Sequence, residues 1–330
     1  MKKELKQELF PRYRGVNLTG MFCTPDSQYA DRTRRGYFLE RDFAEVVECG
    51  FDFVRLPLTY KLFTTEKSPY ELDGKKLELL DRAVQWAEKY HLHVNINLHR
   101  APGYCVNTDV PDDPVLLCRD EEALEYFSNV WCTLAARYRG IPNEKLTFDL
   151  LNEPSPDCFS LERYVLVMKK TVEAIHRVDP ERFCMIDGWV WGDEPIEELG
   201  GLPLTGQSCR GYHPRELTHY LAFDFAKKIP AWPMLDRNGE LYDHDRLDAH
   251  FRKWTEFSVR TGTPVHCGEC GCINHTPREV MLAWADDFLG ILQKYNIGFG
   301  WWTMHGIFGL YRTGDFTEID RGLVEILRKH

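Results

Sequence analysis

Short apolar runs alternate along the chain with longer segments in which apolar residues recur every three or four positions. The short runs have the length of β-strands, and the longer segments have the periodicity of helices. Alternation of this kind predicts repeated βα units and a parallel sheet. The eight expected strands span residues 15–18, 52–56, 92–98, 146–151, 183–186, 207–212, 264–267 and 297–302.

The segments between these strands carry apolar stripes, which are typical of helices packed against a sheet. The clearest stripes begin at Leu77, Leu124, Leu161 and Met281. Eight strands, each followed by a helix, make a (β/α)8 barrel, and a chain of 330 residues has a suitable length for one. The pattern therefore predicts an α/β protein with a single TIM-barrel domain over residues 1–330.

One segment, residues 213–245, lacks a clear period and contains Pro214, Pro230, Pro233 and Gly239. A long connection without regular structure inside a compact domain is usually functional. This segment follows the sixth expected strand, and barrel active sites form at the carboxyl ends of the strands. We expect the long loop 213–245 to lie over the mouth of the barrel.

The formal net charge is −10, and the sequence pI is near 5.7. An acidic surface repels phosphate backbones, which argues against a nucleic-acid partner, whereas neutral sugars need no electrostatic steering. No stretch has the length of a membrane span, and the basic N-terminus is not followed by the apolar run of a secretory signal. We therefore expect no membrane partner and a cytoplasmic protein, or a secreted one if a signal has been removed. The sequence leaves the oligomeric state open.

Two glutamates stand where expected strands end. The strand at 146–151 leads directly into Asn152 and Glu153, and Pro154 then stops it. Glu269 has a glycine one residue before it and another two residues after it, which leaves room for a ligand or for a close backbone approach. Both carboxylates would therefore lie at the same end of one barrel.

A pair of carboxylates at one barrel mouth suits the cleavage of a glycosidic bond. One must be protonated, so that it can donate to the leaving oxygen, and the other must be ionised. A separation near ~5 Å gives retention through a covalent intermediate, whereas roughly 6.5–9.5 Å leaves room for water and gives inversion. Spacing along the sequence does not decide between these outcomes.

Six motifs in order resemble those of glycoside hydrolase family 5, the cellulase-like group of barrel glycosidases. The segments that carry the resemblance are 14–18, 50–57, 97–99, 152–154, 268–271 and 302–309. The resemblance implies a retaining β-glycosidase that acts on β-linked oligosaccharides or polysaccharides of the glucan or mannan type and needs neither a cofactor nor a metal. It also implies that Glu153 is the acid/base and Glu269 the nucleophile of a double displacement.

The same resemblance implies supporting roles for other residues. The arginine of the second strand contacts the nucleophile, the histidine of the third strand lines the subsite beside the cleaved bond, and the asparagine before the acid/base holds the sugar 2-hydroxyl. A tryptophan after the eighth strand forms the floor of the sugar site. In this chain these residues are Arg55, His99, Asn152 and Trp302.

The stretch after the sixth strand departs from the family pattern. The family commonly has His-x-Tyr there, whereas this chain reads Arg210-Gly211-Tyr212-His213. Tyr212 fits the tyrosine that hydrogen-bonds the nucleophile. Two alternatives remain open for the missing histidine: His213 replaces it in space, or Arg210 takes its place with a permanent charge. A cation would lower the pKa of a nearby carboxylate, which suits a nucleophile better than an acid.

The proposed charges are mutually consistent. Arg55 would keep Glu269 ionised by charge pairing. The ionised Glu269 would in turn raise the pKa of Glu153 and keep it protonated for the first step. Once a glycosyl-enzyme has formed, that charge is gone and Glu153 can act as a base toward water.

Two rival interpretations belong to other classes. A barrel of this kind can bind carbohydrate without catalysis. A metal-dependent hydrolase is suggested by Cys267 and Cys270, which form a Cys-x-x-Cys half-site without a second half, and by His91 and His93, which stand at the opening of the third strand. A chelator would inactivate a metal hydrolase and leave a two-glutamate enzyme active.

Overall fold

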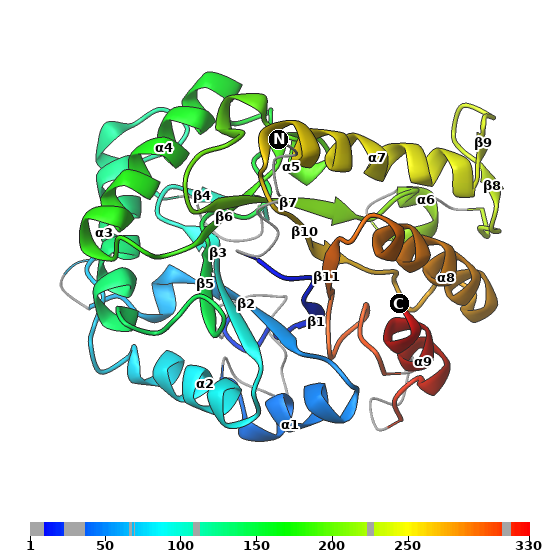
Figure 1. Cartoon of the computed structure of the whole chain (residues 1–330), viewed down its shortest axis with the longest axis horizontal. Coiled ribbons are helices and arrows are strands. Elements are labelled where there is room, and N and C mark those ends of the chain that lie inside the picture. The colour runs from blue at the N-terminus through cyan, green and yellow to red at the C-terminus, as the bar shows by residue number, and fades with distance from the viewer. Residues whose placement is uncertain are drawn as a thin grey trace, which may run out of the picture.

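The computed structural model describes residues 10–22, 37–65, 68, 70–107, 113–222, 228–311 and 318–330. Eight of the described strands are parallel neighbours and close into a barrel at the centre of the molecule (Figure 1). They are β1 (Arg14–Asn17), β2 (Phe53–Thr59), β3 (His93–Ala101), β5 (Leu146–Asp149), β6 (Cys184–Asp187), β7 (Thr205–Gly211), β10 (Val265–Cys270) and β11 (Gly298–Trp301). The neighbour order β2-β1-β11-β10-β7-β6-β5-β3 is closed by the pairing of β2 with β3. The predicted (β/α)8 fold is confirmed.

The barrel strands form where the sequence has nearly continuous apolar runs, because both faces of such strands are covered. Every residue of β2 and β3 is buried. The eight predicted strands match the observed ones to within three residues at each end. A short strand, β4 (Tyr104–Cys105), pairs antiparallel with the end of β3.

Long helices cover the outside of the barrel (Figure 1). They are α1 (Glu40–Glu48), α2 (Glu78–Lys89), α3 (Glu121–Tyr138), α4 (Leu161–Val178), α7 (His244–Thr261), α8 (Arg278–Lys294) and α9 (Arg321–Lys329), and a 3-10 turn, η2 (Tyr60–Leu62), follows β2. The predicted stripes are their inner faces: Leu80, Phe127, Met168 and Trp284 are fully buried. None of the described helices is both long enough and apolar enough to span a membrane.

The connection from β6 to β7 differs from the expectation that a helix follows each strand. It contains only the four-residue α5 (Trp189–Gly192) and the 3-10 turn η3 (Glu197–Leu199). Two prolines and four glycines within residues 188–203 disfavour a longer helix. Val190 and Trp191 both have positive φ, so even α5 is a tight turn rather than a regular helix.

The segment 213–245 is not structureless, and that expectation is wrong. It contains the short helix α6 (Arg215–Thr218) and a hairpin of β8 (Met234–Leu235) and β9 (Leu241–Tyr242). The hairpin turn is stabilised by Asp236, whose carboxylate accepts two backbone N–H groups, and by Gly239 in the left-handed region. Figure 1 shows the hairpin at the N-terminal end of α7. That this segment covers the barrel mouth stays a prediction.

The amino end of the barrel is filled by an aromatic cluster that includes Phe10, Phe53 and Phe183. His93 belongs to this region, where its ring bonds the backbone of Glu144 and the hydroxyl of Thr147. Burial lowers the pKa of His93 to about 3. This histidine therefore has a structural role at the end of the barrel opposite to the usual active-site end.

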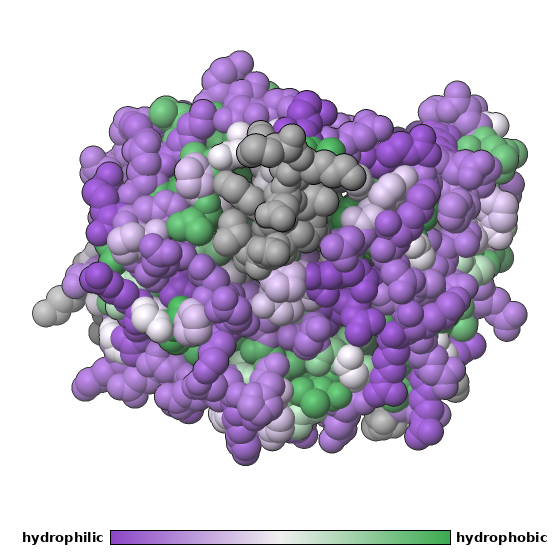
Figure 2. Space-filling model, viewed as in Figure 1, coloured by the Kyte–Doolittle hydropathy of each residue, from purple (hydrophilic) through white to green (hydrophobic). Residues whose placement is uncertain are grey.

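The face in Figure 2 is mostly polar, with scattered apolar patches. Large apolar residues exposed singly at the surface, such as Ile229 and Leu235, are common in soluble proteins and need no special explanation.

Candidate active site

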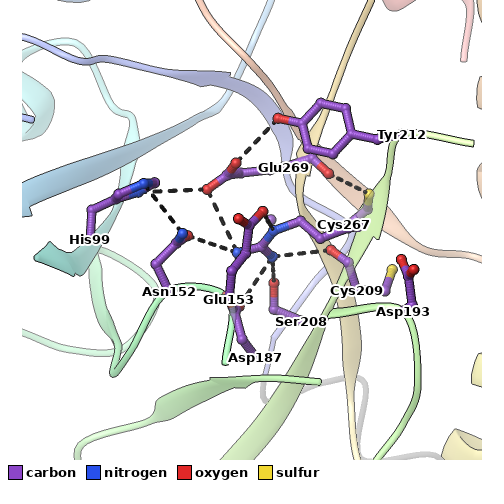
Figure 3. A network of polar contacts seen from close by, with 12 residues as sticks. His99, Asn152, Glu153, Asp187, Asp193, Ser208, Cys209, Tyr212, Cys267 and Glu269 are labelled. Atoms are coloured by element: carbon purple, nitrogen blue, oxygen red, sulfur yellow. Dashed lines mark hydrogen bonds and ion pairs between the residues drawn. The ribbon is translucent and has the colours of Figure 1, made fainter. Parts of the chain in front are cut away.

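The predicted glutamates lie at the carboxyl end of the barrel. Glu153 follows β5 after three residues, and Glu269 lies near the end of β10. Arg55 comes from β2, His99 from β3 and Arg210 from β7. Hydrogen bonds and ion pairs connect all five side chains into one network, part of which is drawn in Figure 3.

The backbone at Glu153 is held in an unusual conformation. Its φ is +48°, in the left-handed region that a non-glycine residue rarely occupies. The amide of Glu153 donates to Oδ2 of Asp187 at 2.7 Å, and its carbonyl accepts from the hydroxyl of Tyr104 at 2.6 Å. Such strain persists only where the surroundings fix it, and it is concentrated at functional sites. These two bonds fix the direction in which the Glu153 side chain leaves the backbone.

An irregularity in β10 sets the position of Glu269. Cys267 is paired with Cys209 of β7, but Glu269 is paired with the next residue, Arg210, so Gly268 is an extra residue in the strand. A Cβ at Gly268 would lie 2.5 Å from the hydroxyl of Ser208. Only glycine fits this bulge without displacing its neighbour.

The second glycine beside Glu269, Gly271, also allows a close approach of the backbone. Gly271 has a φ of +155°, and a Cβ there would lie 2.8 Å from the backbone oxygen of Trp302. The flanking glycines therefore allow close packing of protein groups around Glu269, one of the two alternatives that the sequence left open.

Arg55 is fully buried and holds Glu269 in place. Its Nη1 donates to Oε1 of Glu269 at 2.5 Å, and its Nε donates to Oδ2 of Asp149 at 2.6 Å. Its Nη2 donates to the side-chain oxygen of Asn152 at 2.9 Å, and Asn17 accepts a further bond. The predicted contact between Arg55 and Glu269 is present in the structure.

Arg210 contacts both glutamates. Its Nε donates to Oε1 of Glu153 at 2.9 Å, and its Nη2 lies 3.6 Å from Oε1 of Glu269. The same guanidinium forms a two-pronged pair with the buried Asp187 and donates to Asn152. One planar cation thus lies against both carboxylates.

Tyr212 and His99 approach Glu269 from opposite sides (Figure 3). The hydroxyl of Tyr212 donates to Oε2 of Glu269 at 3.2 Å. Nδ1 of His99 lies 3.9 Å from Oε1 of Glu269, too far for a hydrogen bond, and it is buried without a hydrogen-bond partner among the described residues. Nε2 of His99 lies 3.3 Å from the side-chain nitrogen of Asn152.

Trp302 forms one wall of this region. Its ring is partly exposed and stacks on His99, with ring centroids 5.6 Å apart and an interplanar angle of 27°. Phe22 contacts the ring edge-on. The packing fixes the plane of the indole while part of its surface stays open to a ligand.

The structure decides between the two alternatives for the missing histidine. Arg210 occupies the place beside the glutamates. His213 points instead to Asp193, with Nε2 and Oδ1 2.8 Å apart. His213 therefore does not replace the usual histidine in space, and we assign it no contact with the glutamates.

The surroundings raise the pKa of some ionisable groups in the site and lower the pKa of others. Burial, and then the charge of Glu269, raise the pKa of Glu153 to about 7, although Arg210 opposes the rise. Burial also raises the pKa of Asp149 to about 7. Burial and the nearby arginines lower the pKa of His99 well below its usual value, so its imidazole is neutral. A carboxylic acid that remains protonated near neutral pH is suited to general acid catalysis.

Two buried carboxylates of the network were not predicted. Asp149 and Asp187 are the last residues of β5 and β6, and each pairs with an arginine of the site. Their signal in the sequence is an acidic residue at the end of an apolar barrel strand, the same kind of position that singled out Glu153.

The cysteines near Glu269 each contact a backbone carbonyl. The thiols of Cys267, Cys270 and Cys272 are buried and directed at the carbonyls of Glu269, Gly300 and Leu217, respectively. In the part of the chain that the structure describes, none of these cysteines belongs to a group of side chains that could hold a metal ion. The Cys-x-x-Cys motif is therefore explained by packing.

A closed parallel barrel with two carboxyl groups at its active end is an arrangement found in glycoside-cleaving enzymes. The family model described as "Cellulase (glycosyl hydrolase family 5)" matches residues 13–306. This chain belongs to that family and is a glycoside hydrolase.

Known relatives match nearly end to end. Endoglucanase C of Acetivibrio thermocellus is 26% identical over 96% of this chain and 97% of its own length. Cellodextrinase A of Ruminococcus flavefaciens is 24% identical over 86% of this chain and 83% of its own. A solved structure described as a glycoside hydrolase has a TM-score of 0.87 and 30% identity, and the match covers 96% of this chain and 99% of that one. These comparisons therefore favour an enzyme over a barrel that only binds carbohydrate.

Proposed function

We propose that this protein is a retaining β-glycosidase that hydrolyses β-linked glucan- or mannan-type chains by a double displacement, with Glu153 as acid/base and Glu269 as nucleophile. The observation that carries the proposal is the difference between the two carboxyl groups. Glu269 accepts hydrogen bonds from Arg55 and Tyr212, whereas burial and the charge of Glu269 raise the pKa of Glu153 to about 7.

In the first step, Glu269 attacks the anomeric carbon while Glu153 protonates the departing oxygen. Arg55 and Tyr212 hold the two oxygens of Glu269 from different directions, which fixes the plane of the carboxylate. Preorganised donors of this kind need no rearrangement during the reaction. The bond from Glu269 to the sugar forms as the glycosidic bond breaks, and the leaving alcohol takes the proton of Glu153.

In the second step, Glu153 removes a proton from water, and that water releases the sugar from Glu269. The covalent ester has removed the negative charge of Glu269, which had raised the pKa of Glu153. Arg210, whose Nε lies 2.9 Å from Oε1 of Glu153 in the free enzyme, would stabilise the ionised form of that glutamate. The same glutamate can therefore act as acid and then as base.

The surroundings supply groups that suit a sugar ring. The oxygen of Asn152 is bonded to both arginines, which directs its amide nitrogen away from them as a donor. Nδ1 of His99 is buried and unpartnered in the described structure, so a hydroxyl group could bond it. The partly exposed ring of Trp302 offers apolar area to one face of a pyranose.

The names of the relatives favour glucan substrates. One is called an endoglucanase and another a cellodextrinase. A β-linked chain of glucose units, as a polymer or as a short oligosaccharide, is therefore the substrate class to examine first. Mannan-type chains differ at a single hydroxyl group of each unit and form the next class.

Azide rescue tests the proposal. The variant Glu269→Ala should lose hydrolysis of an aryl β-cellobioside, and added azide should restore cleavage with an α-glycosyl azide as product, because the small anion fills the place of the nucleophile and attacks from its side. Glu279→Ala, at an exposed site on α8, is the matched control and should keep full activity. An active Glu269→Ala variant without azide would reject the assignment.

A further inference from the structure

Three potential metal ligands converge beside the catalytic network. They are Asp193 after α5, His213 after β7 and His250 on α7, and each offers one ligand atom within 4.8 Å of those of the other two. The sequence separation between the first and the last is large, so only the fold brings them together. Neither the catalytic steps nor sugar binding uses any of them.

The two histidines present nitrogen atoms suited to a metal. Nε2 of His213 lies 2.8 Å from Oδ1 of Asp193. The ring of His250 lies against that of His213, with centroids 4.2 Å apart. Nε2 of His250 is buried and has no hydrogen-bond partner anywhere in the described residues. A buried ring nitrogen without a partner is costly unless something else binds it.

The chemical types of the three side chains fit the same purpose. The site thus has one carboxylate and two imidazoles, which are common ligands of Zn²⁺.

Two cations face the cluster, and each already has a carboxylate partner. Arg215 pairs with Oδ2 of Asp193 at 3.1 Å, which leaves Oδ1 as the oxygen toward His213. Nζ of Lys253 lies 2.6 Å from Glu194. Neither cation therefore occupies the space between Asp193 Oδ1 and the imidazole rings.

We propose that Asp193, His213 and His250 form a binding site for a transition-metal dication of the Zn²⁺ type, with solvent as a fourth ligand. The ion would replace the hydrogen between His213 and Asp193, and the His213 ring would then carry its hydrogen on Nδ1. Two imidazoles and one carboxylate favour such an ion over Mg²⁺ or Ca²⁺, which prefer oxygen ligands.

The role assigned to the ion is structural. His213 directly follows Tyr212, which bonds Glu269, and Gly192, which precedes Asp193, packs against the side chain of Arg210. An ion shared with α7 would tie the two loops behind the catalytic residues to the outer helix. The site is distinct from the glutamates, so it does not depend on the proposed mechanism.

Calorimetry and thermal melting of the full chain test the site. The protein is first stripped with a chelator and then titrated with Zn²⁺ alone, with Mg²⁺ and Ca²⁺ titrated separately. We expect one Zn²⁺ per chain and a rise in Tm of about 4 °C at a hundredfold excess over Kd, because the ion binds only the folded state. We expect no comparable effect of Mg²⁺ or Ca²⁺.

Two substitutions and a matched control make the test specific. His250→Gln and Asp193→Asn should each weaken Zn²⁺ binding at least tenfold and abolish the rise in Tm. His244→Gln removes an exposed histidine from the same helix. This control should change neither the affinity for Zn²⁺ nor the rise in Tm. Circular dichroism of the metal-free variants checks that they fold. If one of the two variants does not fold, the Zn²⁺ binding of the other tests the site. Absence of saturable Zn²⁺ binding, or binding that survives both substitutions, would overturn the proposal.

Discussion

Arg210 donates a hydrogen bond from Nε to the Oε1 atom of Glu153 over 2.9 Å, so a permanent cation contacts the residue proposed as acid/base. The family usually has a histidine at this position. The sequence alone suggests that a cation here suits a nucleophile better than an acid. The structure resolves this conflict, because burial and the charge of Glu269 act against Arg210 and the pKa of Glu153 remains raised.

Removal of Arg210 should have separable effects on stability and on pH dependence. Arg210→Gln leaves Asp187 as a buried carboxylate without its cation, which should lower the free energy of unfolding by about 3–5 kcal/mol. The double variant Arg210→Gln/Asp187→Asn removes both charges and should recover most of this loss. Denaturant unfolding of the three proteins measures the difference.

The same two variants should share one kinetic change. Arg210 lowers the pKa of Glu153, so its removal should move the basic limb of the kcat/KM profile to higher pH in both. If the basic limb of the kcat/KM profile stays at the same pH in the stable double variant, Arg210 does not act on Glu153 during the first step.

The pH profile of the unmodified enzyme should depend on the ionisation of Glu153. The first step needs the protonated form, so kcat/KM should fall as the pH rises through about 7. Glu153→Gln should reduce kcat/KM by about 10²–10⁴-fold for a substrate with a poor leaving group, and much less for a dinitrophenyl glycoside, which needs little protonation. Glu162→Gln, on the exposed face of α4, is the matched control and should behave as wild type. Equal losses with both leaving groups would count against the acid role.

The raised pKa of Glu153 should also be visible in stability. Below pH 4.5 the carboxyl group is protonated in both the folded and the unfolded chain, so it makes no pH-dependent difference. Between pH 4.5 and about 7 the unfolded chain ionises first, and the folded state loses stability relative to it. The Tm of Glu153→Gln minus that of wild type should therefore increase over this interval and level off above it. A difference that stays constant from pH 4 to 8 would contradict the raised pKa.

Trp302 should contribute to sugar binding through its exposed ring surface. Loss of this surface in Trp302→Ala removes apolar contact worth about 1.5–3 kcal/mol, so kcat/KM should fall by roughly ten- to a hundredfold. Trp232→Ala is the comparison, because the indole of Trp232 bonds Asp287 of α8 instead. Initial rates on a chromogenic cellobioside distinguish the two. Similar losses in both variants would mean that the effect comes from packing and not from the sugar.

The barrel could be predicted from the sequence because each of its strands and long helices has a pattern within its own segment. Each strand is an apolar run and each long helix has its own stripe, as β3 and α4 illustrate. The prediction of a helix after the fifth strand failed, because prolines and glycines in residues 188–203 override the repeat of the other units. The hairpin in the segment 213–245 was missed because its strands have two residues each, too few for a period.

The site was only partly predictable. Glu153 and Glu269 stand in distinctive local motifs, so the sequence identifies them. The partners of the arginines depend on neighbouring strands and on closure of the barrel: Arg210 of β7 meets Asp187 of β6, and Arg55 of β2 meets Asp149 of β5. No pattern along one segment contains such pairings. The position of His213 beside Asp193 also became clear only from the fold.

The anomeric form of the first product tests the central claim most directly. Proton NMR can follow a β-glycoside that the enzyme cleaves from the earliest minutes, before the released sugar equilibrates in water. Attack by Glu269 followed by attack by water inverts the anomeric carbon twice, so the account predicts that the β-anomer appears first. Initial appearance of the α-anomer would mean a single displacement by water and would contradict the assignment of Glu269 as nucleophile.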